Sequence, residues 1–168
     1  VTPASFEPTI DYVVTKVPRF TFEKFSDTDA VLGTSMRSVG EAMAIGRNFK
    51  ESLQKALISL EIGFSGLDNI FNYSKKEILK KLKINIPNKL LLIAEAFRKK
   101  ISLNKIHNLS KVDPWFLNQI KELVDEENKL ISRGLPKRFE EFNRIKSIGF
   151  SDKKISKLVK INEIIVKS

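Results

Sequence analysis

Residues 113–134 carry the longest helical pattern in the chain, and this pattern constrains the fold more than any other stretch. Asp113 precedes Pro114, which is the order of an N-cap and a first helical residue whose missing N–H costs no hydrogen bond. Gly134 is placed to end the helix. The apolar residues between them predict one buried stripe: Phe116, Leu117, Ile120, Leu123, Val124, Leu130 and Ile131. Burying each side chain contributes about 1.5–3 kcal/mol, more than a cap worth about 1 kcal/mol, so packing holds this region together.

Shorter helices are predicted on both sides of this stretch. Asn48 and Glu51 have the spacing of a capping box, and a buried face follows at Phe49, Leu53, Ala56, Leu57 and Leu60, with Gly63 placed to end that helix. Three helices are expected between residue 63 and the long helix: one capped by Ser74 with Ile78, Leu79 and Leu82 inward, Leu91–Arg98 with Ile93, Ala94 and Phe97 inward, and one capped by Ser102 with Leu103, Ile106 and Leu109 inward. Two more are expected after the long helix: Pro136–Lys146 with Phe139, Phe142 and Ile145 inward, and one capped by Ser151 with Ile155 and Leu158 inward. Ile161–Val166 begins a last helix.

The helical part of the chain contains an internal repeat at an offset of 49 residues. The aligned positions are Ile101-Ser102, Ile106, Leu109, Val112-Asp113 and Phe116 with Phe150-Ser151, Ile155, Leu158, Ile161-Asn162 and Ile165. Two copies are too few for a solenoid, so they indicate two packed subdomains. The long helix lies between them, and we expect it at the centre of the domain. The fold class is therefore mainly α, an irregular array of about seven or eight short helices with an internal duplication.

The first 47 residues read differently, as extended chain. Residues 10–17 are rich in β-branched residues and predict a strand that Pro18 stops. Residues 19–25 alternate apolar and polar, and residues 26–33 read as a loop. Residues 38–47 predict a short strand between two glycines, with Val39, Met43 and Ile45 as its apolar side chains. So few strands are marginal alone, which predicts a short α/β fragment of a larger domain.

Composition sets limits on partners and setting. Residues 1–62 hold 7 Lys and Arg against 8 Asp and Glu, whereas residues 63–168 hold 23 against 12. The lysines come as helix-face pairs, which favours a solvated surface over a nucleic-acid interface. The absence of cysteine excludes a disulfide framework. No apolar run approaches the roughly 20 residues of a membrane span, and no signal peptide is visible. Because the chain does not begin with Met, we expect an excerpt of a longer protein.

Few residues are candidates for chemistry. The single histidine, His107, has no second His or Cys with which to form a metal site, and we interpret it as a surface or boundary residue. The carboxylates at residues 125–127 point in different directions on a helix and are expected on a solvated face. Trp115 is expected in the core. Arg19, Arg37 and Arg47 lack a glycine-rich phosphate cradle and are interpreted as surface or interface ion pairs. We therefore assign no catalytic, cofactor-binding or metal-binding residue.

Several long sequence words resemble the large subunit of carbamoyl phosphate synthetase. They are residues 2–16, the Pro18-Arg19-Phe20 triplet, residues 35–47, residues 51–57, and residues 113–117. The resemblance implies that residues 1–62 are the tail of the first ATP-grasp half, the carboxyphosphate domain. It implies that residues 63–168 form the helical oligomerization domain that connects the two halves.

The same resemblance implies a function for the segment. The family is an ATP-dependent ligase that makes carbamoyl phosphate from bicarbonate, glutamine-derived ammonia and two ATP, for arginine and pyrimidine biosynthesis. ATP and magnesium, or manganese, would bind elsewhere in the parent enzyme, and this segment would be a cytoplasmic, non-catalytic scaffold without a cofactor. Its implied partners are the second ATP-grasp half, other large subunits and the small glutaminase subunit, with no nucleic acid and no membrane.

A helix-turn-helix module that binds nucleic acid is the alternative interpretation. Residues 149–158 resemble its first helix, and this half of the chain is basic. However, Lys160 occupies the position where a turn glycine is common. The helix after Asn162 is short and offers only Lys167 as a base-reading cation.

Overall fold

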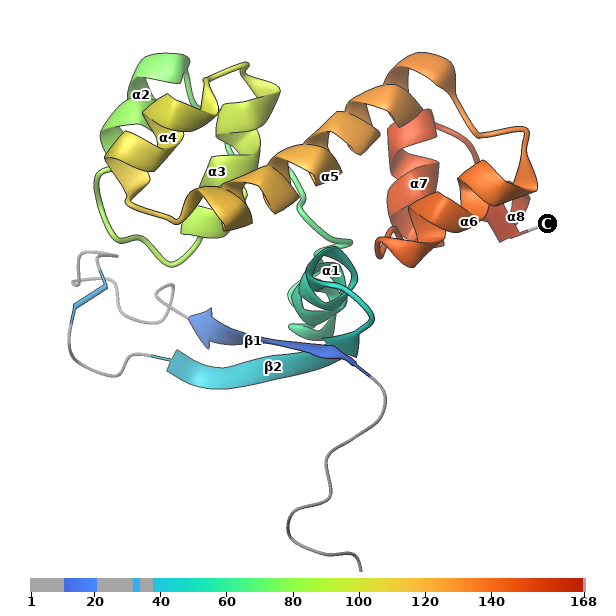
Figure 1. Cartoon of the computed structure of the whole chain (residues 1–168), viewed down its shortest axis with the longest axis horizontal. Coiled ribbons are helices and arrows are strands. Elements are labelled where there is room, and N and C mark those ends of the chain that lie inside the picture. The colour runs from blue at the N-terminus through green and yellow to red at the C-terminus, as the bar shows by residue number, and fades with distance from the viewer. Residues whose placement is uncertain (1–10, 21–31, 34–37, 168) are drawn as a thin grey trace, which may run out of the picture.

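The structure, a computed structural model, describes residues 11–20, 32–33 and 38–167. Within these residues two strands are followed by eight helices (Figure 1), so the predicted mainly α fold with a short β fragment is confirmed. The elements are β1 (Val13–Phe20), β2 (Ser38–Gly46), α1 (Phe49–Ser59), α2 (Lys75–Lys81), α3 (Lys89–Arg98), α4 (Leu103–Ser110), α5 (Pro114–Arg133), α6 (Phe139–Ser147), α7 (Asp152–Val159) and α8 (Glu163–Lys167).

The two strands pair antiparallel, with Val13 opposite Gly46 and Pro18 opposite Glu41. The prediction that Pro18 stops the first strand is wrong, because β1 continues to Phe20. In the described sheet both strands are edges, and an edge strand tolerates proline because one side of its backbone has no partner strand. Most of the predicted extended segment at 19–25 and of the loop at 26–33 lies outside the described residues.

The sheet has one face under α1 and one bare face. Ala42 and Ala44 are buried beneath α1, whereas Val39, Met43 and Ile45 are exposed, Met43 to 65%. The predicted strand at 38–47 is therefore confirmed, but its large apolar residues point away from the helix. Small residues lie on the inner face because α1 approaches it closely: a Cβ on Gly46 would lie 2.7 Å from the backbone nitrogen of Ser52.

Helix α1 begins and packs largely as its sequence predicts. The Asn48 side chain accepts a hydrogen bond from the backbone N–H of Glu51 at 2.9 Å. The Glu51 carboxylate reaches one residue further back than in a standard capping box, accepting from the N–H of Arg47 at 2.8 Å. The helix ends at Ser59, and Glu61, before the expected Gly63, is the first residue to take a left-handed conformation, with φ 54°.

The internal repeat is a structural duplication. We call residues 89–117 the first repeat and residues 138–166 the second. Helices α4 and α7 begin and end 49 residues apart, and so do the first residues of α5 and α8. The turns match as well: Lys111 and Lys160 have φ of 59° and 60°, and Lys100 and Gly149 have φ of 57° and 96°.

Hydrogen bonds and burial repeat with the backbone. The N–H of Lys100 donates to Phe97 at 2.8 Å, and the equivalent N–H of Gly149 donates to Lys146 at 2.9 Å. Asp113 accepts from the N–H two residues later, and Asn162 does the same at the start of α8. The central isoleucines, Ile106 and Ile155, are both fully buried. Each repeat is thus the same helix, turn and helix-start unit.

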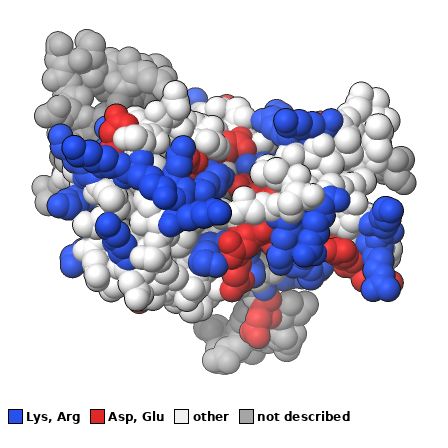
Figure 2. Space-filling model, turned by 90° about the horizontal axis from the view of Figure 1, so that it is seen from above, with Lys and Arg blue, Asp and Glu red and all other residues white. Residues whose placement is uncertain are grey.

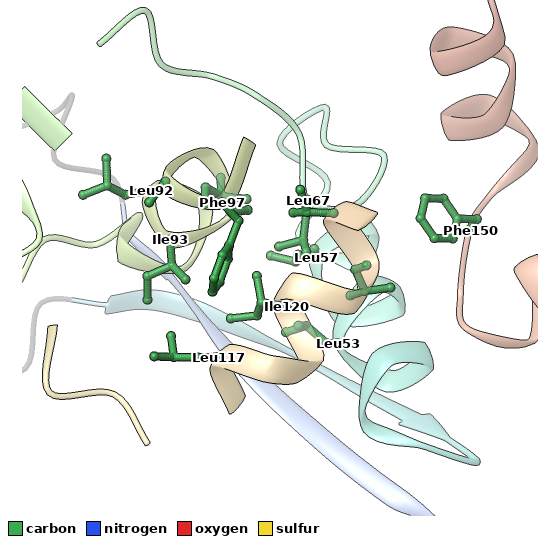
Figure 3. Close-up of a cluster of buried hydrophobic side chains, with 14 of the residues drawn as sticks. Leu53, Leu57, Leu67, Leu92, Ile93, Phe97, Leu117, Ile120 and Phe150 are labelled. Carbon is green, nitrogen blue, oxygen red and sulfur yellow. The ribbon is translucent and has the colours of Figure 1, made fainter. Parts of the chain in front are cut away.

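Helix α5 connects the repeats and packs against both. It contacts α3 and α4 on one side, α1 in the middle and α7 towards its far end (Figure 1). Its buried residues are Leu117, Ile120, Leu123, Val124, Glu126, Glu127 and Leu130. Figure 3 shows Leu117 and Ile120 facing the core beside Leu53, Leu57, Ile93 and Phe97. The predicted central position of this helix is confirmed.

Three apolar residues expected in the core lie at its edge instead. Phe116 and Ile131 on α5 are exposed, and so is Phe139 at the first position of α6. Two helix boundaries also differ from the prediction, because α3 begins at Lys89 and not at Leu91, and α6 begins at Phe139 and not at Pro136. Helix α3, in contrast, is buried from Leu91 to Phe97 on all sides, because α2, α4 and α5 surround it.

We predict that Leu123→Ala unfolds the helical region cooperatively. Leu123 is about 1% exposed, and removing its side chain costs the transfer energy plus a cavity, about 2–5 kcal/mol in total. Lys121→Ala, which removes only an exposed ion pair to Asp125, should stay within about 0.5 kcal/mol of the parent. Thermal and urea melts measure both. Equal melting of the two variants would show that α5 presents a different face to the core.

Candidate functional site

Five charged side chains meet inside the helical region, and we call them the ion cluster: Asp68, Glu95, Arg98, Glu127 and Lys154. Arg98 donates to one Glu127 oxygen from Nε at 2.9 Å and from Nη2 at 2.8 Å. Lys154 Nζ lies 2.9 Å from the other Glu127 oxygen and 2.9 Å from Asp68 Oδ1. Glu95 adds a longer pairing to Arg98 at 3.5 Å. The cluster holds three carboxylates against two cations, and Lys99, whose Nζ lies 3.7 Å from Glu95 at its edge, supplies the third positive charge.

The ion cluster also holds the connection between α1 and α2. Both Arg98 and Lys154 donate to the carbonyl oxygen of Leu67. Asp68 accepts from the backbone N–H of Ser65 at 2.7 Å. Burial alone would raise the pKa of Asp68, but the hydrogen bonds from Lys154 and Ser65 outweigh it and the pKa lies below its usual value. The connection is thereby fixed against both repeats.

The cluster joins parts of the chain that are distant in sequence. Arg98 ends α3 in the first repeat, Lys154 lies on α7 in the second, and Glu127 comes from α5 between them. Lys154 is 4% exposed and Glu127 is 3% exposed. Charges this well buried are tolerated only when each is paired, and removing one member leaves its partner uncompensated. These contacts hold the two repeats in one position relative to each other.

The carboxylates at 125–127 do not share the solvated face that we expected. Asp125 is half-buried and paired with Lys121, but Glu126 and Glu127 are buried. Burial opposes ionisation of Glu126, yet hydrogen bonds from Arg144 at 2.7 Å and Lys129 at 2.8 Å lower its pKa. The sequence did contain a signal for Glu127, because it lies four residues after Leu123 and three before Leu130, within the apolar stripe.

Trp115 was expected in the core but is 53% exposed. It lies two residues before the buried Leu117, about 200° around the helix, and so points away from the core. Its ring packs 5.4 Å from that of Phe49 and 4.9 Å from that of Phe116, centroid to centroid. These three rings form a partly exposed aromatic surface where α1 and α5 begin.

The other candidate residues have structural surroundings. His107 is half-buried, and its Nδ1 lies 2.8 Å from the carbonyl oxygen of Val112, across the turn into α5. Arg47 forms the expected surface ion pair, its Nε 3.3 Å from Glu51. Arg19 is exposed opposite Gly40 in the sheet, and Arg37 lies outside the described residues. The three of these residues that the structure describes, His107, Arg47 and Arg19, do not come together in one site.

Two searches of the described residues gave negative results. In that part of the chain no group of three or more His, Asp or Glu side chains is placed to hold a metal ion. None of the described helices combines the length and the apolarity that a bilayer crossing requires.

The helix-turn-helix interpretation is not supported. Lys160 adopts the left-handed conformation that a turn glycine would, so the turn itself forms. However, α8 presents Ile164 and Ile165 to solvent at the positions where base-reading side chains would lie. Exposed isoleucines at the start of a helix are typical of a protein contact.

Comparison with known proteins identifies the family. Residues 41–168 match the family described as carbamoyl-phosphate synthetase large chain, oligomerisation domain, and the chain belongs to this family. The predicted resemblance is thus confirmed. The chain is 53% identical to the carbamoyl phosphate synthase large chain of Haemophilus ducreyi over 162 residues, which are 96% of this chain and 15% of that protein.

Other relatives agree. The chain is 49% identical to the large chain of Campylobacter jejuni, over 96% of this chain and 15% of that protein. It is 49% identical to the arginine-specific large chain of rice, described as chloroplastic, over 92% of this chain and 14% of that protein. The chain therefore spans about 15% of the length of the curated relatives it matches.

We predict that Lys154→Ala destabilises the chain by about 3–5 kcal/mol, because Glu127 and Asp68 each lose a buried cationic partner. The matched control is Lys105→Ala, which changes the exposed lysine at the equivalent position of the first repeat and should cost no more than about 0.5 kcal/mol. Urea unfolding measures both free energies. Equal costs would contradict the role given to the ion cluster.

We predict that Glu51 contributes to acid sensitivity. The hydrogen bond from Lys55 is the largest cause that lowers the pKa of Glu51 to about 2. Hydrogen bonds from Arg47 add to it, and burial opposes both. A lowered pKa favours the folded state fully above the ordinary value of 4.5, and this contribution is lost as the pH falls from 4.5 towards 2. Glu51→Gln should therefore melt below the parent near neutral pH, and the difference should shrink across that window.

Melting curves from neutral pH down to about pH 2.5 test this, with Glu140→Gln as an exposed control. A difference between Glu51→Gln and the parent that is the same at both ends of the range would contradict the prediction.

Proposed function

We propose that this chain is the connecting and oligomerisation segment of a carbamoyl phosphate synthase large chain, acting as a scaffold for an ATP-dependent ligase. The observation that carries the proposal is the match of residues 41–168 to the oligomerisation domain, together with about half identity over nearly the whole chain. The activity of the whole enzyme is part of the proposal, because this segment covers only about 15% of its relatives.

In this proposal, residues 1–62 end the first ATP-grasp half and residues 63–168 form the helical domain. The bare face of the sheet supports this division. Tyr12, Val14, Val39, Met43 and Ile45 make it exposed and largely apolar around one ion pair, Lys16 with Glu41, which is typical of a surface that another layer covers. We infer that the remainder of the first half covers it. Helix α1 then links that half to α5.

The chemistry belongs elsewhere in the parent enzyme. ATP and magnesium, or manganese, would bind in the two ATP-grasp halves, and no residue of this segment is assigned to catalysis or to a cofactor. Carbamoyl phosphate would be made from bicarbonate, glutamine-derived ammonia and two ATP, for arginine and pyrimidine biosynthesis in the cytoplasm. The partners would be the second ATP-grasp half, the small glutaminase subunit and other large subunits.

The test uses the complete large chain carrying Leu123→Ala, with Lys121→Ala as the control. We expect Leu123→Ala to weaken self-association in sedimentation velocity and to lower carbamoyl phosphate synthesis more than ATP hydrolysis, because the scaffold is damaged while the active sites remain. Lys121→Ala should match the parent in both assays. Loss of ATP hydrolysis in step with synthesis, at unchanged association, would contradict the scaffold role.

A further inference from the structure

One pair of equivalent positions differs sharply between the two repeats. Of the positions 101–117 and their equivalents at 150–166, all described, only Lys105 and Lys154 change from exposed to buried. The helices α4 and α7 that carry them match in length, in the backbone angles of their N-cap residues and in the left-handed residue that follows each, although Ser151 makes a side-chain cap hydrogen bond and Ser102 does not. The difference therefore comes from what covers each helix and not from the helices themselves.

In the second repeat, the covering segment is the connection at residues 65–68. Lys154 Nζ contacts the Leu67 carbonyl at 3.2 Å and the Asp68 carboxylate at 2.9 Å. At the edges of the same face, Lys157 Nζ donates to Ser65 Oγ at 3.2 Å and Ser151 Oγ donates to the Ser65 carbonyl at 3.4 Å. This face of α7 thus binds a tightly turned segment, closed by the hydrogen bond from the Ser65 N–H to Asp68, in which an apolar residue directly precedes the aspartate.

In the first repeat, the equivalent face borders an open groove. Leu109, the equivalent of Leu158, lies with Leu79 of α2 at the apolar floor, and the groove encloses about 530 Å³. Its rim holds one carboxylate, Glu77, which is engaged in capping α2, and four lysines. The lysines are Lys76, Lys80, Lys83 and Lys105.

The charge of this rim is not neutralised within the described chain. None of the four lysines forms an ion pair with another described residue. Figure 2 shows Lys and Arg side chains gathered on the side of the molecule where Figure 1 places α2 and α4. Four neighbouring cations repel one another, and a carboxylate placed among them relieves that repulsion.

We propose that this α2–α4 groove binds an acidic segment of a partner protein, in which an apolar side chain is followed by Asp or Glu. The apolar side chain would cover Leu79 and Leu109, and the carboxylate would pair with Lys105 as Asp68 pairs with Lys154. A leucine floor favours a peptide over nucleic acid, because a single strand is held by aromatic stacking and none of the described residues that line the groove is aromatic.

The experiment titrates the whole ¹⁵N-labelled chain with a capped peptide that copies residues 62–70, the segment bound in the second repeat. We expect amide shifts at Lys105, Leu109 and Leu79. Lys105→Glu should weaken binding about tenfold, since it replaces attraction by repulsion, and Lys153→Glu, an equal charge change on an exposed site of α7, should leave it unchanged. A peptide with Asn in place of Asp68 should bind as weakly as Lys105→Glu does.

The proposal is overturned by any of three results. The first is the absence of shifts in the groove at about 2 mM peptide. The second is amide shifts at Ser65 and Lys154 alone, which would mean that the peptide only displaces residues 62–70 of the chain from α7. The third is oligothymidine that binds the groove residues when the peptide does not. Self-association is measured separately by sedimentation, so failure here leaves the proposed scaffold role standing.

Discussion

Glu127 lies between Arg98 and Lys154, and the arrangement of the helical region depends on these contacts. Hydrophobic packing along α5 provides most of the stabilisation, but the hydrophobic effect is non-directional. Separating a buried carboxylate from its cations is strongly destabilising, because it leaves an uncompensated charge out of water. Because one cation comes from each repeat, the carboxylate selects a single relative position for them. Asp68 and the Leu67 carbonyl extend the same requirement to the connection after α1.

The two repeats show how one local structure is used in two ways. Their helix lengths, turns and buried central isoleucines are alike. Their surfaces differ because each meets other parts of the chain. Lys154 is enclosed by the 65–68 connection, whereas Lys105 remains on the rim of a groove. The duplication therefore provides an internal comparison: the segment that covers Lys154 indicates what kind of ligand would suit the groove at Lys105.

The sequence predicted well whatever is encoded locally. The caps at Asn48, Ser74, Asp113 and Ser151 each form a side-chain hydrogen bond in the structure, and the repeat appears with its 49-residue spacing. The cap expected at Ser102 is the exception, because Ser102 is the N-cap residue of α4 but its side chain forms no cap hydrogen bond. Predictions failed where burial depends on which element of the chain packs against a residue. Pattern alone could not tell which side of β2 would meet α1, or that α5 would turn Trp115 outward.

The ion cluster illustrates the same limit. Glu127 could have been recognised as buried from its place within the apolar stripe, but its partners could not. Arg98 is 29 residues away and Lys154 belongs to another helix, so no spacing rule connects them. The sequence prediction that no residue of this segment is catalytic or binds a cofactor stays a prediction. Sequence motifs do not mark the surfaces through which a scaffold acts.

Helix α5 acts as a spacer of fixed length and fixed phase. Its 20 residues span about 30 Å, and each residue adds about 1.5 Å and 100° of rotation. One inserted residue would swing the whole second repeat around the axis and carry Lys154 away from Glu127. Length changes are therefore tolerable only beyond Gly134, in the connection to α6. We expect evolution to vary that connection and to preserve the residue count of the helix.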